Sequence, residues 1–135
     1  MISDFTQYIY DSAVNDGFFD NFKLMLENDF HQLKFPFRND IISFGTEKND
    51  RLDFLLGYDI VESGDEKTVV TVLTDERSGG AYCEQCAKDI CMKILELDND
   101  RMIISVTVDR CVYDPNAFAY KVKMSFGLRE AAVGI

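Results

Sequence analysis

Apolar residues recur at every third or fourth position through residues 82–97, YCEQCAKDICMKILEL. At 3.6 residues per turn this spacing gathers them on one side of a helix, and polar or charged residues occupy the other side. The predicted buried side consists of Cys83, Cys86, Ala87, Ile90, Cys91, Ile94 and Leu95. We therefore predict a central amphipathic helix, preceded by a tight turn at Gly79 and Gly80.

Strand patterns lie on both sides of this helix in the sequence. Residues 68–74, TVVTVLT, are mostly β-branched, which favours a strand. Residues 102–113 and 118–128 flank an Asp-Pro-Asn turn sequence at 114–116, and together they predict an antiparallel hairpin. Apolar and polar residues alternate along its second strand, so one face is expected to be buried and the other wet. The predicted core positions of that strand are Phe118, Tyr120, Val122, Met124, Phe126 and Leu128.

The N-terminal third is less regular. Residues 3–14 predict a first helix, because Ser3 or Asp4 can cap it and its apolar residues share one side. Residues 18–30 fit a helix, and a short strand at 22–26 is the alternative; we favour the helix. Pro36 interrupts the following stretch, which predicts an extended linker or edge segment.

Shorter elements follow. Residues 40–45 predict a strand, residues 46–51 a polar loop, and residues 52–62 a second extended run. Residues 63–67 form a turn into the next strand, and the small apolar tail at 130–135 is expected to be loosely held unless a partner covers it. These patterns predict one α+β domain: an antiparallel or mixed sheet, the central helix packed on one face, and an N-terminal helix.

Composition narrows the function. A chain of 135 residues can bury the core of one domain. The formal net charge of −10 argues against general or sequence-specific nucleic-acid binding, which needs the opposite balance. No apolar run is long enough to span a membrane, and the first residues do not resemble a signal peptide. We expect a soluble cytoplasmic protein without a membrane partner.

The cysteines invite a metal or redox interpretation. Cys83-x-x-Cys86 has the spacing of half a zinc site, but no second pair follows and the single histidine, His31, is remote. A redox pair is the other alternative, since Cys83 would lie near a helix N-terminus. Both cysteines fall on the predicted buried side, so we favour structural thiols that behave as small apolar side chains.

Other candidate chemistry is weak. A serine–histidine–aspartate triad would have to use His31, and Gly79-Gly80 lacks the lysine of a phosphate loop. Asp98-Asn99-Asp100 does not continue as a calcium loop, so we interpret it as a helix-to-strand turn. We assign no catalytic, cofactor-binding or metal-binding residue and predict a protein that is not an enzyme.

The order of four motifs suggests a family. LKFPFRNDIISFG at 33–45, DFLLG at 53–57, SGGAYC at 78–83 and YDPN at 113–116 follow one another over most of residues 1–129. In this order and chain length, the sequence resembles the small tail-terminator proteins, also called tail-completion or collar proteins, of phages and phage-like contractile particles from Firmicutes.

The resemblance implies assembly rather than catalysis. Such proteins form a ring, commonly a homohexamer, that caps the tail tube and ends polymerisation of tube and sheath. The implied partners are further copies of the chain, the tail-tube protein, a sheath protein in contractile tails, and a neck or head connector where a head exists. The protein would act in the bacterial cytoplasm and then reside in a virion, a prophage-encoded particle or a headless bacteriocin-like particle.

Three alternatives remain: another head–tail joining or neck component, a small-molecule-binding regulatory α+β domain, and a thiol enzyme that uses Cys83 and Cys86. For an assembly protein, we expect contacts in the loops at 46–51 and 63–67, in the extended run between them, and along a basic stripe on the last strand. The candidate contact residues are Glu47, Asn49, Arg51, Phe54, Leu55, Asp65, Lys67, Lys121, Lys123 and Arg129.

Overall fold

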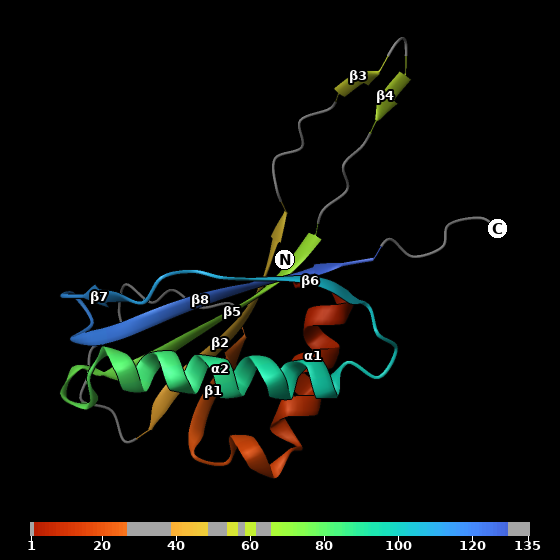
Figure 1. Cartoon of the computed structure of the whole chain (residues 1–135). Coiled ribbons are helices and arrows are strands. Elements are labelled where there is room, and N and C mark those ends of the chain that lie inside the picture. The colour runs from red at the N-terminus through yellow and green to blue at the C-terminus, as the bar shows by residue number, and fades with distance from the viewer. Residues whose placement is uncertain (1, 27–38, 49–53, 57–58, 62–65, 130–135) are drawn as a thin grey trace.

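The computed structural model describes residues 2–26, 39–48, 54–56, 59–61 and 66–129 (Figure 1). It is a single small α+β domain with a mixed six-stranded sheet and two α-helices. The helices are α1 (Asp4–Val14) and α2 (Gly80–Leu97), with short 3-10 turns η1 (Gly17–Phe19) and η3 (Glu76–Ser78). The strands are β1 (Phe22–Leu26), β2 (Asp40–Lys48), β3 (Phe54–Leu56), β4 (Asp59–Val61), β5 (Glu66–Asp75), β6 (Ile103–Val108), β7 (Val112–Asp114) and β8 (Ala119–Leu128).

The main sheet has the strand order β1-β2-β5-β8-β6, and β7 also pairs with β8. β1 runs parallel to β2, whereas the remaining pairs are antiparallel. β2, β5 and β8 are therefore the inner strands, β1 forms one edge, and β6 and β7 lie along the other. β3 and β4 pair only with each other, as a separate two-stranded sheet.

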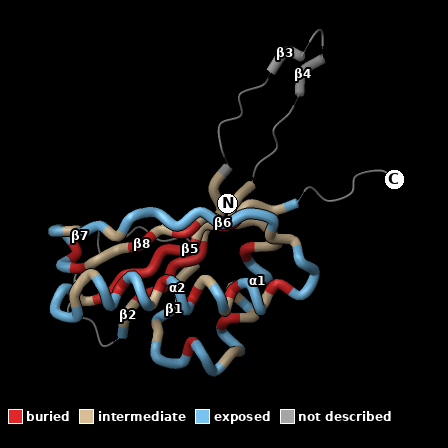
Figure 2. The backbone as a smooth tube through the Cα atoms, viewed as in Figure 1, coloured by how far each residue is buried: buried red, intermediate tan, exposed pale blue. Residues whose placement is uncertain are grey.

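Both helices cover the same face of the main sheet (Figure 1). α2 packs on β5 and β8, while α1 packs on β1 and β2. One apolar core joins the two layers, and its buried stretches concentrate where the sheet meets the helices (Figure 2). Its largest fully buried side chains include Phe44, Phe126, Ile9, Ile90 and Met124.

The opposite face of the sheet carries no described helix. A small second cluster of Ile41, Leu73, Ala117 and Ala119 is buried at one end of this face. The rest of the face is mixed and polar. We call it the polar face and define it by Glu47 on β2, Lys67 on β5, and Lys121 and Lys123 on β8.

Most predicted elements are confirmed. The central helix begins two residues earlier than predicted and buries Cys83, Ala87, Ile90 and Ile94. Cys86 and Cys91 are half-buried at the margins of this side, and Leu95 is exposed. Ser3 caps α1 by accepting a hydrogen bond from the backbone N–H of Thr6. In the C-terminal hairpin, Val122, Met124 and Phe126 are buried as the alternation predicts.

Two predictions near the termini are wrong. Residues 22–26 form a strand rather than part of a helix, because β1 pairs in parallel register with β2. Phe118 does not face the core: with φ of 55° it lies in the left-handed region at the turn, and its side chain is exposed.

The strand boundaries in the middle of the chain also differ from the prediction. β2 continues to Lys48 and β5 starts at Glu66, so Glu47 and Lys67 lie in paired strands rather than in loops. The extended run predicted for 52–62 divides into β3 and β4, which pair as a hairpin. The predicted linker around Pro36 and the tail at 130–135 lie outside the described residues.

Candidate assembly surfaces

Four of the predicted contact residues gather on the polar face. Glu47 lies directly opposite Lys67 in the β2–β5 register, and cross-strand neighbours share a face of the sheet. Lys123 reaches across β5, and its Nζ lies 3.1 Å from Glu47 Oε2. Lys121 Nζ lies 4.0 Å from Asp114 Oδ2. The predicted basic stripe is therefore largely paired with carboxylates of the same chain, and the polar face presents charges of both signs.

The remaining predicted contacts lie elsewhere. Arg129 follows β8 and is exposed, and its backbone N–H donates to the carbonyl of Met102 at 2.7 Å. Phe54 and Leu55 belong to β3, in the separate hairpin. The other three, Asn49, Arg51 and Asp65, lie outside the described residues. Of the predicted contacts that the structure describes, four lie on the polar face, two in the β3–β4 hairpin, and Arg129 lies after the end of β8.

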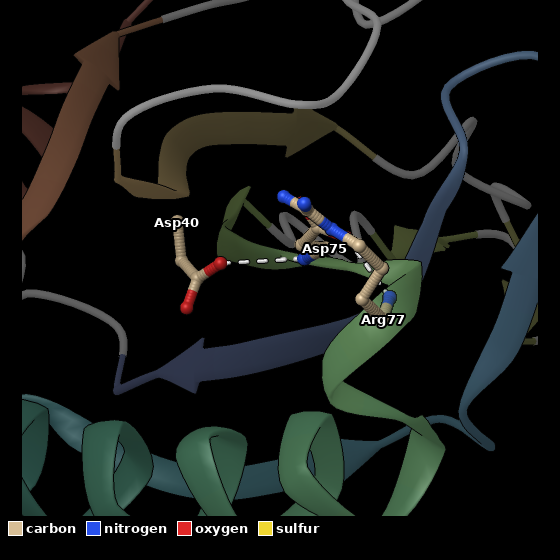
Figure 3. A network of polar contacts seen from close by, with 3 residues as sticks. All are labelled: Asp40, Asp75 and Arg77. Carbon is tan, nitrogen blue, oxygen red and sulfur yellow. Dashed lines mark hydrogen bonds and ion pairs between the residues drawn. The ribbon is translucent and has the colours of Figure 1, made fainter.

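A polar network that no sequence pattern indicated joins β2, the end of β5 and η3 (Figure 3). Asp40 Oδ1 accepts a hydrogen bond of 3.3 Å from the backbone N–H of Asp75. The Arg77 guanidinium donates two hydrogen bonds to the Asp75 carboxylate, of 3.0 and 2.6 Å. The bonds from the Arg77 side chain and backbone hold the pKa of Asp75 below its ordinary value. Asp75 is thus an ion-paired residue at the end of β5.

Tyr82, in the first turn of α2, completes this network. Its hydroxyl donates to Asp40 Oδ2 at 3.2 Å. The hydrogen bond with Cys86, followed by burial and the negative charge of Asp40, raises the pKa of Tyr82. The phenol therefore stays protonated at neutral pH and serves as a hydrogen-bond donor between α2 and the beginning of β2.

The cysteine environment favours structural thiols. Burial raises the pKa of the Cys83 thiol to about 12, and its Sγ lies 4.0 Å from the carbonyl oxygen of Val72. Burial also raises the pKa of Cys86 and of Cys91. These shifts oppose formation of the thiolate that nucleophilic and redox chemistry require. Among the described residues, no three histidine, cysteine or acidic side chains are placed to hold a metal ion.

An apolar edge of the main sheet is a further surface that sequence patterns did not reveal. β6 is six residues long, from Ile103 to Val108, and contains no charged side chain. Ile104, Val106 and Val108 are exposed on it. The sequence could not reveal this exposure, because a β-branched run looks the same in an inner strand and in an edge strand.

Comparisons of the chain with protein-family models, curated proteins and solved structures find no match. No helix in the described part of the chain is both long and apolar enough to cross a membrane.

Proposed function

We propose that this chain is a tail terminator: a structural subunit that assembles as a ring on the end of a phage-type tail tube and stops its polymerisation. The order of sequence motifs described above supports the proposal. In a contractile tail the same ring would hold the upper end of the sheath. The proposed partners are further copies of the chain, the tube protein, the sheath protein and a neck or head connector.

The β3–β4 hairpin is the observation on which the proposal depends most. It lies between β2 and β5 in the chain and pairs with neither of them. In a ring, each subunit contacts its two neighbours through two different surfaces that fit one another. A hairpin that is not part of the main sheet is suited to this role, and it carries Phe54 and Leu55.

The charge distribution is compatible with this role. The polar face presents paired charges, and the whole chain carries a net charge of −10. A ring that surrounds a DNA passage benefits from an acidic surface, because like charges keep the nucleic acid from adhering. A headless particle would place no such demand on the ring.

A tube-length assay tests the proposal. Tail-tube protein is polymerised with and without the chain, and tube lengths and tube ends are measured in electron micrographs. We expect added chain to shorten the tubes and to appear as a ring of density at one end. Light scattering of the mixture gives the mass of the assembled ring.

A variant that lacks the β3–β4 hairpin tests whether this segment is needed for capping. Lys48 and Glu66 are directly opposite each other in the β2–β5 ladder, so an Asn-Gly pair in place of residues 49–65 closes a two-residue turn. This variant should fold and fail to cap tubes, whereas Lys88→Ala on the exposed side of α2 should cap normally. Tubes of unchanged length with the wild-type chain contradict the proposal and favour the small-molecule-binding alternative.

A further inference from the structure

The edge strand β6 is uncovered on the face that bears the helices. Val106 lies opposite Phe126 and Val108 opposite Met124, so both valines share the face that forms the core. α2 covers β5 and β8 instead. As a result Val106 is 37% exposed, Val108 51% and Ile104 65%.

The backbone N–H of Ile103, at the start of β6, donates to the Asp98 carboxylate, and beyond the bulge the outer backbone groups of β6 lack a strand partner in the described sheet. The backbone N–H of Asp109 donates to the carbonyl of Lys123, so residue 109 directs its backbone toward β8. Alternate residues of a strand direct their hydrogen bonds to opposite sides, so Val106 and Val108 direct theirs outward. An uncharged, apolar edge of this kind is a template for pairing with another strand. One protective feature is present, a bulge between Ile103 and Ser105.

The charges that flank β6 identify the strand that would fit. Asp100 and Arg101 precede it, and Asp109 and Arg110 follow it. All four are exposed, and none of their side chains makes an ion pair within the described residues. An antiparallel copy of the same strand, centred on Ser105, would bring the Asp100–Arg101 end of each copy beside the Asp109–Arg110 end of its partner.

We propose that two copies of this chain pair through their β6 edges, antiparallel and in the register that sets Ser105 opposite Ser105 of the second copy. The Asp100–Arg101 segment of each copy then lies beside the Asp109–Arg110 segment of the other. The regular ladder ends before these segments meet, at the bulge between Ile103 and Ser105 and the left-handed backbone of Arg101. The two-fold axis is perpendicular to the sheet, so both helical layers lie on one side of a continuous sheet. The exposed valines of the two β6 strands cover one another between the two α2 helices.

A second copy fits better than an unrelated partner for two reasons. The aspartate–arginine order at both ends of β6 is complementary to itself in antiparallel orientation. Each chain also carries a net charge of −10, so two copies repel over most of their surfaces. The uncharged run of β6, flanked by complementary pairs, is a surface where they can approach.

The pairing is independent of the proposed function. The two-fold dimer is complete with two copies and forms from the free chain in solution, whereas the proposed ring forms on a tail tube. Loss of pairing with normal tube capping would therefore overturn only the pairing. Normal pairing with no effect on tubes would overturn only the tail-terminator proposal.

A charge-swap series tests the pairing. Sedimentation equilibrium of the full chain should detect a monomer–dimer equilibrium. Asp109→Arg and Arg101→Asp should each weaken it about tenfold or more, because each change sets two like-charged pairs across the axis. Arg101 has φ of 52°, a conformation that aspartate also tolerates. The double variant R101D/D109R restores opposite charges and should restore the wild-type dissociation constant.

Asp89→Arg on α2 is the matched control, because it changes the net charge as Asp109→Arg does but lies outside the edge. Thermal unfolding of each variant verifies that it is folded. A strictly monomeric wild-type chain overturns the proposal. Equal effects of Asp109→Arg and Asp89→Arg, or a double variant no better than the single ones, also overturn it.

Single cysteines measure the register. Ser105 would lie opposite its own copy with Cα atoms about 4.5 Å apart, a separation that a disulfide spans. Ser105→Cys should therefore form a covalent dimer under mild oxidation. Thr107→Cys should not, because residue 107 and its copy are offset by roughly 13 Å along the strands. Cross-linking through position 107 instead of 105 would overturn the proposed pairing.

Discussion

The hydroxyl of Thr6 in α1 lies 2.9 Å from the hydroxyl of Thr68 in β5, across 62 positions of sequence. Both residues are buried. Thr6 Oγ1 also lies 2.8 Å from Thr46 Oγ1 on β2, and Ser3 joins the same cluster. The first helix is thus fixed to two strands by buried hydroxyl groups as well as by apolar packing.

Thr6→Val should destabilise the domain although it conserves volume. It leaves the hydroxyls of Thr46 and Thr68 short of a buried partner, which costs about 1–3 kcal/mol of unfolding free energy. Urea unfolding followed by circular dichroism measures the change. Ser12→Ala is the control, because its hydroxyl donates to the carbonyl of Tyr8 at the exposed surface of α1. An equal loss in both variants would contradict a special role for the buried cluster.

Asp98 should be essential for the connection from α2 to β6. Its buried carboxylate accepts hydrogen bonds from the backbone N–H groups of Met102 and Ile103, at 2.9 and 2.8 Å. Asp98→Ala removes both acceptors and should lower the unfolding free energy by about 2–3 kcal/mol. Asp98→Asn keeps one acceptor oxygen and should lose less. Asp100→Asn, two residues away and exposed, should change stability by less than about 0.5 kcal/mol.

The thiol of Cys83 should react slowly. Because burial raises its pKa to about 12, little thiolate exists at neutral pH, and alkylation by iodoacetamide should keep accelerating as pH rises past about 9. The same chain unfolded in guanidinium provides the fully accessible reference. A rate that levels off near neutral pH would contradict the structural role and revive the thiol-enzyme hypothesis. Cys83→Ser should lower stability by about 1–2 kcal/mol by burying a hydroxyl.

Arg77 should control the acid titration of Asp75. The folded pKa of Asp75 lies below the ordinary value of 3.8, so the folded chain binds its proton less readily than the unfolded chain does. The stability that this ion pair contributes is therefore present above about pH 4 and is lost as pH falls through the folded pKa. Arg77→Gln should raise the pKa of Asp75 toward 3.8 in a carboxyl NMR titration. An unchanged pKa would show that another group lowers it.

The sequence pattern alone was sufficient to predict the elements in which apolar residues recur with one clear period. The α2 helix and the β8 strand follow from repeats of 3.6 and 2 residues, and their buried positions agree with the core. Residues 22–26 could not be assigned in this way, because Phe22, Met25 and Leu26 fit a helix and a short strand equally well. The parallel partner β2, which begins fourteen positions later at Asp40, decides between them.

The assembly surfaces depend on strand order, which sequence pattern does not specify. β6 and β5 are both rich in β-branched residues, but β5 lies between two strands and β6 at an edge. Contacts such as Lys123 with Glu47 join strands that are not adjacent, so they too follow from topology rather than from spacing. The charged residues of the polar face could therefore be predicted from the sequence, whereas their pairing and the exposure of Val106 and Val108 could not.

The position of the β3–β4 hairpin has an evolutionary consequence. The ladder between β2 and β5 is complete at Lys48 and Glu66, so the hairpin adds nothing to that ladder. Insertions of other lengths and sequences could replace it over generations while the core residues stay the same. Selection on the hairpin would then be uncoupled from selection on folding, and related chains could diverge fastest in this segment as their neighbours change.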